Sequence, residues 1–71
     1  MSHLRKLRKA HKYTQEYMAE HLNITAPTYT KKELGHLRFS LVEAKAIADL
    51  FGKTIEDIFF EDEVSDMERP A

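Results

Sequence analysis

The stretch that decides the fold is residues 14–35, which read TQEYMAEHLNITAPTYTKKELG. Met18 and Leu22 stand four residues apart, so they lie on one face of a helix that begins after Thr14. Asn23 interrupts this helix, because asparagine accepts a left-handed backbone better than any residue except glycine. The spacing therefore predicts a short helix that ends in a tight turn.

A second short helix follows this turn. Thr25 can cap its N-terminus, and Tyr29 sits one turn further along. Ala19 stands where the two helices would cross, and its small side chain lets the two backbones approach each other. Two short helices joined by a tight turn have the spacing of a helix-turn-helix.

The motifs in this stretch occur together and in order. They are Thr14-Gln15-Glu16, Ala19, Leu22-Asn23-Ile24-Thr25, Thr28-Tyr29 and Glu33-x-Gly35. With them the chain resembles the Cro/repressor-type family of bacterial and phage DNA-binding domains, also called Xre-like or lambda-repressor-like, from about Leu4 to about Phe60. The resemblance implies an all-α fold: a compact five-helix lambda-repressor-like bundle with a helix-turn-helix in its second and third helices.

Length, charge and the absence of cysteine limit the class of protein. Seventy-one residues form one small domain, and a chain without cysteine has no disulfide or thiolate metal site. Residues 1–38 hold eight Lys or Arg and three Glu, whereas residues 39–71 hold three Lys or Arg and nine Asp or Glu. The basic half is the face expected to meet DNA phosphates, although solvated surface charge gives the same pattern.

Apolar spacing and capping residues predict the first three helices. The first spans residues 2–11 with Ser2 as its cap, and the second spans residues 15–22. The third is expected to start at Pro27, because proline disfavours helical geometry at Ala26 and leaves it extended or capping.

The later helices have their own start and stop signals. Gly35 ends the third helix as a left-handed cap, and Gly52 stops the fourth. The capping boxes are Ser40-x-x-Glu43 for the fourth helix and Thr54-x-x-Asp57 for the short fifth helix. The apolar stripe of the fourth helix is Leu41, Ala44, Ile47, Ala48 and Phe51.

Lys32 departs from the general helix-turn-helix pattern. It stands three residues after Tyr29, where a core apolar residue is usual. Burying an unpaired ammonium group is costly, so we expect the Lys32 stem to pack on the core with its charge in water. Alternatively, a neighbour takes its place in the core, for which Leu34, Leu37 and Phe39 are available.

The resemblance makes the third helix the recognition helix, with its N-terminal residues in the major groove of DNA. The expected base contacts are Ala26, Pro27 and Lys31, with Thr28 and Thr30 nearby. Lys31 can donate to guanine O6 and N7, whereas Ala26 and Pro27 offer only apolar contact, best to a thymine methyl group. For each of these residues the alternative is an ordinary solvent-facing position.

The expected phosphate contacts surround the recognition helix. They are Gln15, His36 and Arg38, with Lys12 and Lys32 as secondary candidates. Gln15 stands at the first position of the second helix, beside exposed backbone amides, and the family uses the matching residue to bind a phosphate. A solvent-facing Gln15 is the alternative. His36 and Arg38 follow the recognition helix directly, where a DNA backbone would run.

The resemblance also implies a structural ion pair between Arg8 and Glu33. The pair would be partly buried and would join the first helix to the end of the third. Two independent surface charges are the alternative.

The end of the chain is the expected dimer surface. Residues 1–60 are expected to form the helix-turn-helix DNA-binding domain, followed by an acidic, flexible tail over residues 61–71. Ile58, Phe59 and Phe60 carry more apolar surface than one short helix can bury, which predicts a dimer surface. Alternatively, these three residues close the core of the monomer.

Together these features predict a sequence-specific regulator of transcription that binds double-stranded DNA. The specific expectation is a phage or prophage-type repressor that binds a palindromic operator as a homodimer. One alternative is an antitoxin-like or adaptor module whose main ligand is another protein. Another is a fragment of a larger regulator that has lost its sensor domain.

Other function classes find little support in the sequence. The four histidines lack the spacing of a metal site, and no Ser, His and acid arrangement or Gly-rich phosphate loop stands out. We therefore expect no enzymatic activity, no metal, no cofactor and no small-molecule ligand. No apolar run approaches the length of a membrane span, and a cytoplasmic location is expected.

Overall fold

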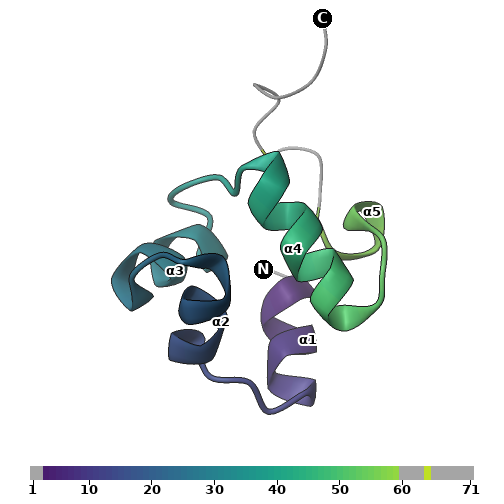
Figure 1. The fold of residues 1–71 in the computed structure, drawn as a ribbon, viewed down its shortest axis with the longest axis horizontal. Helices are drawn as coiled ribbons and strands as arrows, with labels where there is room; N and C mark the ends of the chain where they lie inside the picture. The colour runs from purple at the N-terminus through teal and green to yellow at the C-terminus, as the bar shows by residue number, and fades with distance from the viewer. Residues whose placement is uncertain (1–2, 60–63, 65–71) are drawn as a thin grey trace, which may run out of the picture.

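Five helices build the computed structural model, which describes residues 3–59 and residue 64. In chain order they are α1 (His3–Ala10), α2 (Gln15–Leu22), α3 (Ala26–Glu33), α4 (Leu41–Phe51) and α5 (Ile55–Ile58) (Figure 1). Within the described residues, β-structure is limited to one isolated parallel bridge between Phe39 and Val64. The predicted all-α, five-helix fold with a helix-turn-helix in α2 and α3 is confirmed.

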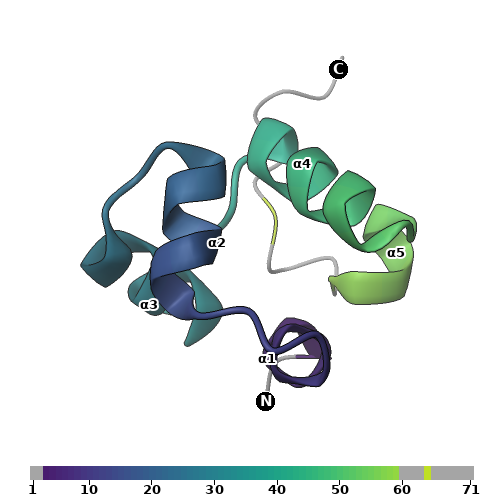
Figure 2. The ribbon, with the colours of Figure 1, turned by 60° about the horizontal axis from the view of Figure 1, so that its bottom comes forward.

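The helices form two groups. The pair α2 and α3 lies on one side of the molecule and the pair α4 and α5 on the other, with α1 beside both pairs (Figure 1 and Figure 2). Ala19 of α2 is almost fully buried, which fits the close packing of α2 on α3. This arrangement leaves one side of α3 facing away from the rest of the molecule.

Four of the helices begin at a side-chain cap. Each capping residue has an extended backbone, and its hydroxyl accepts a hydrogen bond from the N–H three residues later, a donor that the helix leaves unpaired. These residues are Thr14, Thr25, Ser40 and Thr54. Both predicted capping boxes are present. The predicted cap Ser2 lies outside the described residues.

The start of α3 differs from the prediction. The helix begins at Ala26 and not at Pro27, with Pro27 as its second residue. The extended residue is Thr25, whose hydroxyl accepts from the N–H of Thr28. The hydrogen bond from the Thr28 N–H to the Thr25 hydroxyl encloses Ala26 and Pro27 in the first turn of the helix. This cap outweighs the weaker tendency of a residue before proline to avoid helical geometry.

Four helix ends share one backbone motif. A left-handed residue donates its N–H to the carbonyl three residues back, and the next residue donates to the carbonyl five residues back. The left-handed residues are Lys12, Asn23, Gly35 and Gly52, with φ angles of 60°, 64°, 89° and 66°. Asn23 and Gly35 match the predicted left-handed positions, and Gly52 ends α4 as predicted. The sequence predicts no left-handed residue after the first helix, which ends at Ala10 and not at His11.

The core draws on every helix and on the segment after α3. Its largest fully buried side chains are Tyr29, Leu4, Met18, Ile47 and Ile58. Phe39, between α3 and α4, packs its ring against Tyr29 and Phe59, with centroid separations of 6.1 and 5.2 Å. Phe39 therefore links the helix-turn-helix to the end of the chain.

The expected dimer surface is not exposed. Ile58 and Phe59 are only 2% and 6% exposed and belong to the core of the monomer, while Phe60 lies outside the described residues. The Phe59 ring packs against Phe39, which brings the end of the chain into the core. Val64, in the segment expected to be a flexible tail, is also buried and pairs with Phe39. A core residue therefore lies beyond the predicted domain boundary at residue 60.

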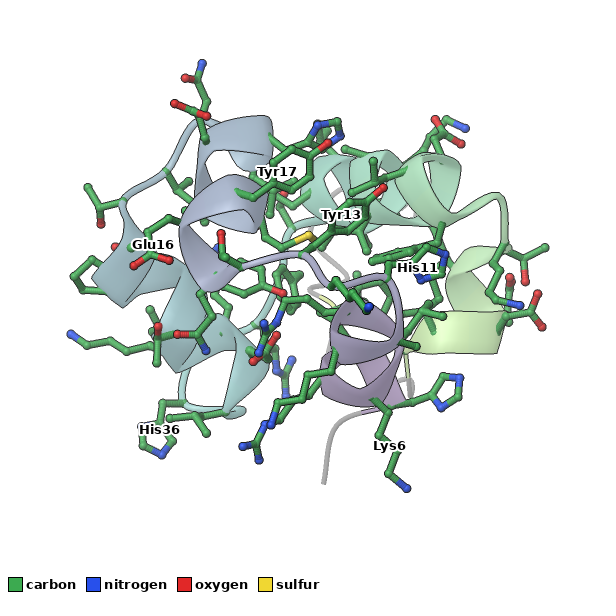
Figure 3. All side chains as sticks on the ribbon, turned by 90° about the horizontal axis from the view of Figure 1, so that it is seen from below. Lys6, His11, Tyr13, Glu16, Tyr17 and His36 are labelled. Atoms are coloured by element: carbon green, nitrogen blue, oxygen red, sulfur yellow. The ribbon has the colours of Figure 1, made fainter. Side chains whose placement is uncertain are left out.

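A row of four rings joins α2 to the rest of the molecule. His11, Tyr13, Tyr17 and His21 follow one another with centroid separations of 5.7, 4.6 and 6.3 Å. His11 also meets Phe51 of α4 at 4.9 Å. Figure 3 shows Tyr13 and Tyr17 side by side, with His11 next to them. These contacts hold the connection between α1 and α2 against α4.

The left-handed backbone of Lys12 leads to the first prediction. A residue with a β-carbon is strained in this conformation by about 1 kcal/mol, and glycine is not. We expect Lys12→Gly to raise the free energy of unfolding by roughly 0.5–1 kcal/mol in urea denaturation without DNA. Lys12→Ala, which keeps the β-carbon, is the matched control and should change little. If the Lys12→Gly chain is no more stable than the Lys12→Ala chain, the backbone of Lys12 is not strained.

Candidate nucleic-acid interface

The helix α3 has one buried and one exposed side. Tyr29 and Glu33 are buried against the other helices, whereas Pro27, Lys31 and Leu34 are exposed. The exposed residues are spaced by four and three positions, so they share one helical face. This face carries a cation and two apolar side chains.

The predicted base contacts do not all lie on this face. Lys31 and Pro27 are fully available, and within the described residues the Lys31 ammonium group has no partner. The Thr28 hydroxyl accepts a 2.8 Å hydrogen bond from Thr25 and keeps its own proton. Thr30 differs from the others, because its hydroxyl lies 3.0 Å from both the Gln15 side-chain oxygen and the Ala26 carbonyl oxygen. Ala26 itself is half-buried.

Three of the predicted phosphate contacts have free side chains. Lys12, His36 and Arg38 are exposed, and within residues 3–59 and 64 their charged or ring groups have no partner. Figure 3 shows His36 projecting beyond the end of α3, at the opposite edge of the view from Tyr17. Gln15 is half-buried at the first position of α2, and its side chain already contacts α3. The cations therefore lie before α2 and after α3.

Lys32 is not available for a phosphate, contrary to the prediction. Its Nζ lies 2.7 Å from Glu43 Oε1 and 3.3 Å from the carbonyl oxygen of Arg38. The ammonium group also stands 5.9 Å above the Phe39 ring. A cation that is held by a carboxylate with both side chains mostly buried has little to gain from moving to DNA. The charge is therefore neutralised inside the protein and is not left in water.

The core space next to Lys32 is filled by one of the three neighbours proposed from the sequence. Phe39 is 2% exposed, whereas Leu34 and Leu37 are 59% and 46% exposed. The two leucines therefore belong to the surface around the end of α3.

A buried polar cluster joins α1, α2 and α3 behind the exposed face. Arg8 Nε donates to Glu33 Oε2 at 2.8 Å, and Arg8 Nη2 donates to Glu33 Oε1 at 3.2 Å. Glu33 also accepts from the Tyr29 hydroxyl at 2.8 Å and from Gln15 Nε2 at 3.1 Å. Arg8 donates a further bond to the carbonyl of Tyr13 at 2.9 Å. The ion pair is thus two-pronged and shared among three helices.

The charge states in this cluster follow from its hydrogen bonds. Burial alone would raise the pKa of the Glu33 carboxyl, but hydrogen bonds from Arg8, Tyr29 and Gln15 outweigh it and hold this pKa below its usual value. The hydrogen bond to Glu33 raises the pKa of Arg8, and burial raises the pKa of Tyr29 well above its ordinary value. At neutral pH the cluster therefore contains a carboxylate, a guanidinium and a neutral phenol.

Sequence reasoning missed three parts of this arrangement. The Tyr29 hydroxyl stands four residues from Glu33, a helical spacing that brings the two side chains together. Glu43 is both the capping-box residue and the partner of Lys32. The spacing of Tyr13, Tyr17 and His21 by four residues was the available signal for the row of rings.

Other kinds of site are not seen in the described part of the chain. No group of three His, Asp or Glu residues there could hold a metal ion. None of its helices has the length and apolar character needed to cross a membrane. An open hollow between α2 and the start of α3 is lined in part by Glu16, Glu20 and Thr25.

The geometry defines the class: two short helices, a left-handed turn and an exposed second helix make a helix-turn-helix domain. The family model for this class, HTH_3 (helix-turn-helix), matches residues 4–58. The chain therefore belongs to the HTH_3 family of Xre/lambda-repressor-like domains, and it is a DNA-binding regulator of transcription. Members of this family are generally not enzymes. Comparisons with curated proteins and with solved structures gave no match.

The Glu33 cluster predicts how stability depends on pH. The carboxyl takes up its proton near pH 4.5 in the unfolded chain and at lower pH in the folded chain, so the unfolded chain binds more protons in between. The contribution of this group to the free energy of unfolding is complete above about pH 4.5 and is lost as the pH falls through the folded pKa.

We expect Glu33→Gln to flatten this acid dependence in urea denaturation from pH 3 to pH 7. At pH 7 the variant should lose about 3 kcal/mol of stability, because Arg8 is left buried without its counter-charge. Glu16→Gln, which removes an exposed carboxylate from α2, is the control and should keep the wild-type profile. If the free energy of unfolding of Glu33→Gln falls with decreasing pH as steeply as that of the wild-type chain, other carboxyl groups cause the acid dependence.

Proposed function

We propose that this protein is a phage or prophage-type repressor that binds a palindromic operator as a homodimer, with α3 in the major groove. The observation that carries the proposal is the outer face of α3, where Lys31 is exposed and has no partner within the described residues. The same helix is fixed from behind by the Glu33 cluster, so this face is presented in one orientation.

The residues on α3 determine what such a helix would read. The major groove of B-DNA admits an α-helix, and Lys31 has the donors for guanine O6 and N7. Pro27 and Ala26 would meet a thymine methyl group, and Thr28 has a hydroxyl proton for a base or phosphate oxygen. With one long polar side chain, each half-site would be read at few positions.

Phosphates on both sides of the groove would be held by different segments. Lys12 and Gln15 lie before and at the start of α2, and His36 and Arg38 lie just after α3. Phosphate contacts fix the register of the protein on the duplex but read no sequence. Lys32 takes no part, because Glu43 already neutralises it.

We infer a homodimer because the exposed face of α3 offers few base contacts. A single short helix with few base contacts discriminates poorly against the many competing sites of a genome, and two copies on a palindrome multiply the selectivity. The contact between copies does not involve Ile58 or Phe59, since both are buried in the monomer.

The experiment is a selection of bound duplexes from a random pool, followed by titration of the enriched sequence. We expect a palindrome with half-sites separated by about 10 base pairs and two chains per duplex by sedimentation. Lys31→Ala should reduce the preference at one base pair of each half-site by about 1–3 kcal/mol. Lys45→Ala, which removes an exposed cation from α4, is the matched control and should keep the preference.

Two outcomes would contradict this proposal. If no duplex is enriched and none competes at low salt, the chain is better explained as a protein-interaction module. If duplexes are enriched but Lys31→Ala keeps every base preference, α3 does not read the sequence through Lys31.

A further inference from the structure

The Gln15 side chain connects α2 to two residues of α3. Its Nε2 donates to Glu33 Oε1 at 3.1 Å, and its Oε1 accepts from the Thr30 hydroxyl at 3.0 Å. Because the Glu33 carboxylate can only accept, the amide nitrogen has to face Glu33 and the amide oxygen has to face Thr30. Two residues of α3 therefore determine how the Gln15 amide is oriented.

One N–H of this amide stays available. A side-chain amide nitrogen carries two N–H groups, and among the described residues one of them is used, by Glu33. The backbone N–H groups of Gln15 and Glu16, in the first turn of α2, also lack a partner in this part of the chain. A phosphate oxygen at the N-terminus of α2 would meet these donors and the positive end of the helix dipole.

Thr30 has no proton left for DNA. Its hydroxyl carries one proton, which lies within hydrogen-bond reach of the Gln15 Oε1 and of the Ala26 carbonyl oxygen, both at 3.0 Å. The side chain is half-buried, in contrast to the exposed Lys31 beside it. The hydroxyl thus acts within the protein, although it is carried by the recognition helix.

We propose that Thr30 is a positioning residue, which orients Gln15 for a phosphate of duplex DNA and makes no base contact itself. This inference rests on the proposed DNA binding. In this arrangement Thr30 of α3 positions the Gln15 side chain of α2 that contacts the phosphate. The helix that reads the bases therefore also positions a contact to the DNA backbone. Loss of the Thr30 hydroxyl then weakens binding to every sequence alike.

The test compares Thr30→Val, Thr30→Ser, Gln15→Ala and the double variant Gln15→Ala/Thr30→Val in the full chain. Binding to the selected operator and to a random duplex is measured over a range of salt concentrations. Valine keeps the shape of threonine without the hydroxyl, and urea denaturation checks that each variant is folded. Thr30→Ser keeps the hydroxyl and should bind like the wild-type chain.

We expect Thr30→Val to weaken binding to both duplexes by roughly fivefold, the value of one neutral hydrogen bond. The ratio of operator to random binding should stay constant. The slope of affinity against salt should also stay constant, because the Gln15 amide is uncharged and displaces no counterion. In the Gln15→Ala background the Thr30→Val change should have no further effect.

Different failures are distinguishable. If the wild-type chain binds no duplex, both the proposed function and this inference are wrong. If the wild-type chain binds but Thr30→Val alters the preference at one base pair, Thr30 is a base contact. If Thr30→Val has no effect, or if its effect adds fully to that of Gln15→Ala, Thr30 does not act through Gln15. Each of the last three results overturns the inference and leaves DNA binding standing.

Discussion

The buried carboxylate of Glu33 holds three helices together. Its two oxygens accept hydrogen bonds from Arg8 of α1, Gln15 of α2 and Tyr29 of α3. A buried charge with unsatisfied oxygens would cost several kcal/mol, a large part of the stability of a domain this small. This one group therefore ties α3 to α1 and α2, in addition to the apolar packing of Ala19 and Tyr29, and supports the outward direction of Lys31.

The sequence predicts the helices well where a local bond specifies them. The capping boxes at Ser40 and Thr54 are visible as residue spacings, because the partners are three residues apart. The start of α3 was misplaced because two local rules conflict at Ala26, and the cap from Thr25 prevails. Contacts between distant residues, such as Phe39 with Val64, carry no comparable signal in a single sequence. For the same reason the sequence leaves both a dimer surface and the monomer core open for Ile58 and Phe59, and the structure places both residues in the core.

The candidate interface was predictable by residue type but not by direction. The family resemblance placed Thr28, Thr30 and Lys31 at or near the base contacts, and Lys32 was a secondary candidate for a phosphate contact. The structure separates them: Lys31 faces outward, Lys32 is bound to Glu43, and Thr30 faces Gln15. Which side of α3 faces outward depends on the partners of Tyr29 and Glu33, and several of these, such as Arg8, Gln15 and Phe39, lie outside α3.

The four hydrogen-bonded helix ends have a mechanical consequence. The links after α1, α2 and α4 are three or four residues long, and each starts from a locked left-handed turn. Such links leave α3 little freedom to shift when it meets a ligand. A backbone held in this way adapts little to a duplex, so a misfit would be absorbed mainly by bending or twisting of the DNA. Base steps that deform cheaply would then be favoured even where no side chain touches them.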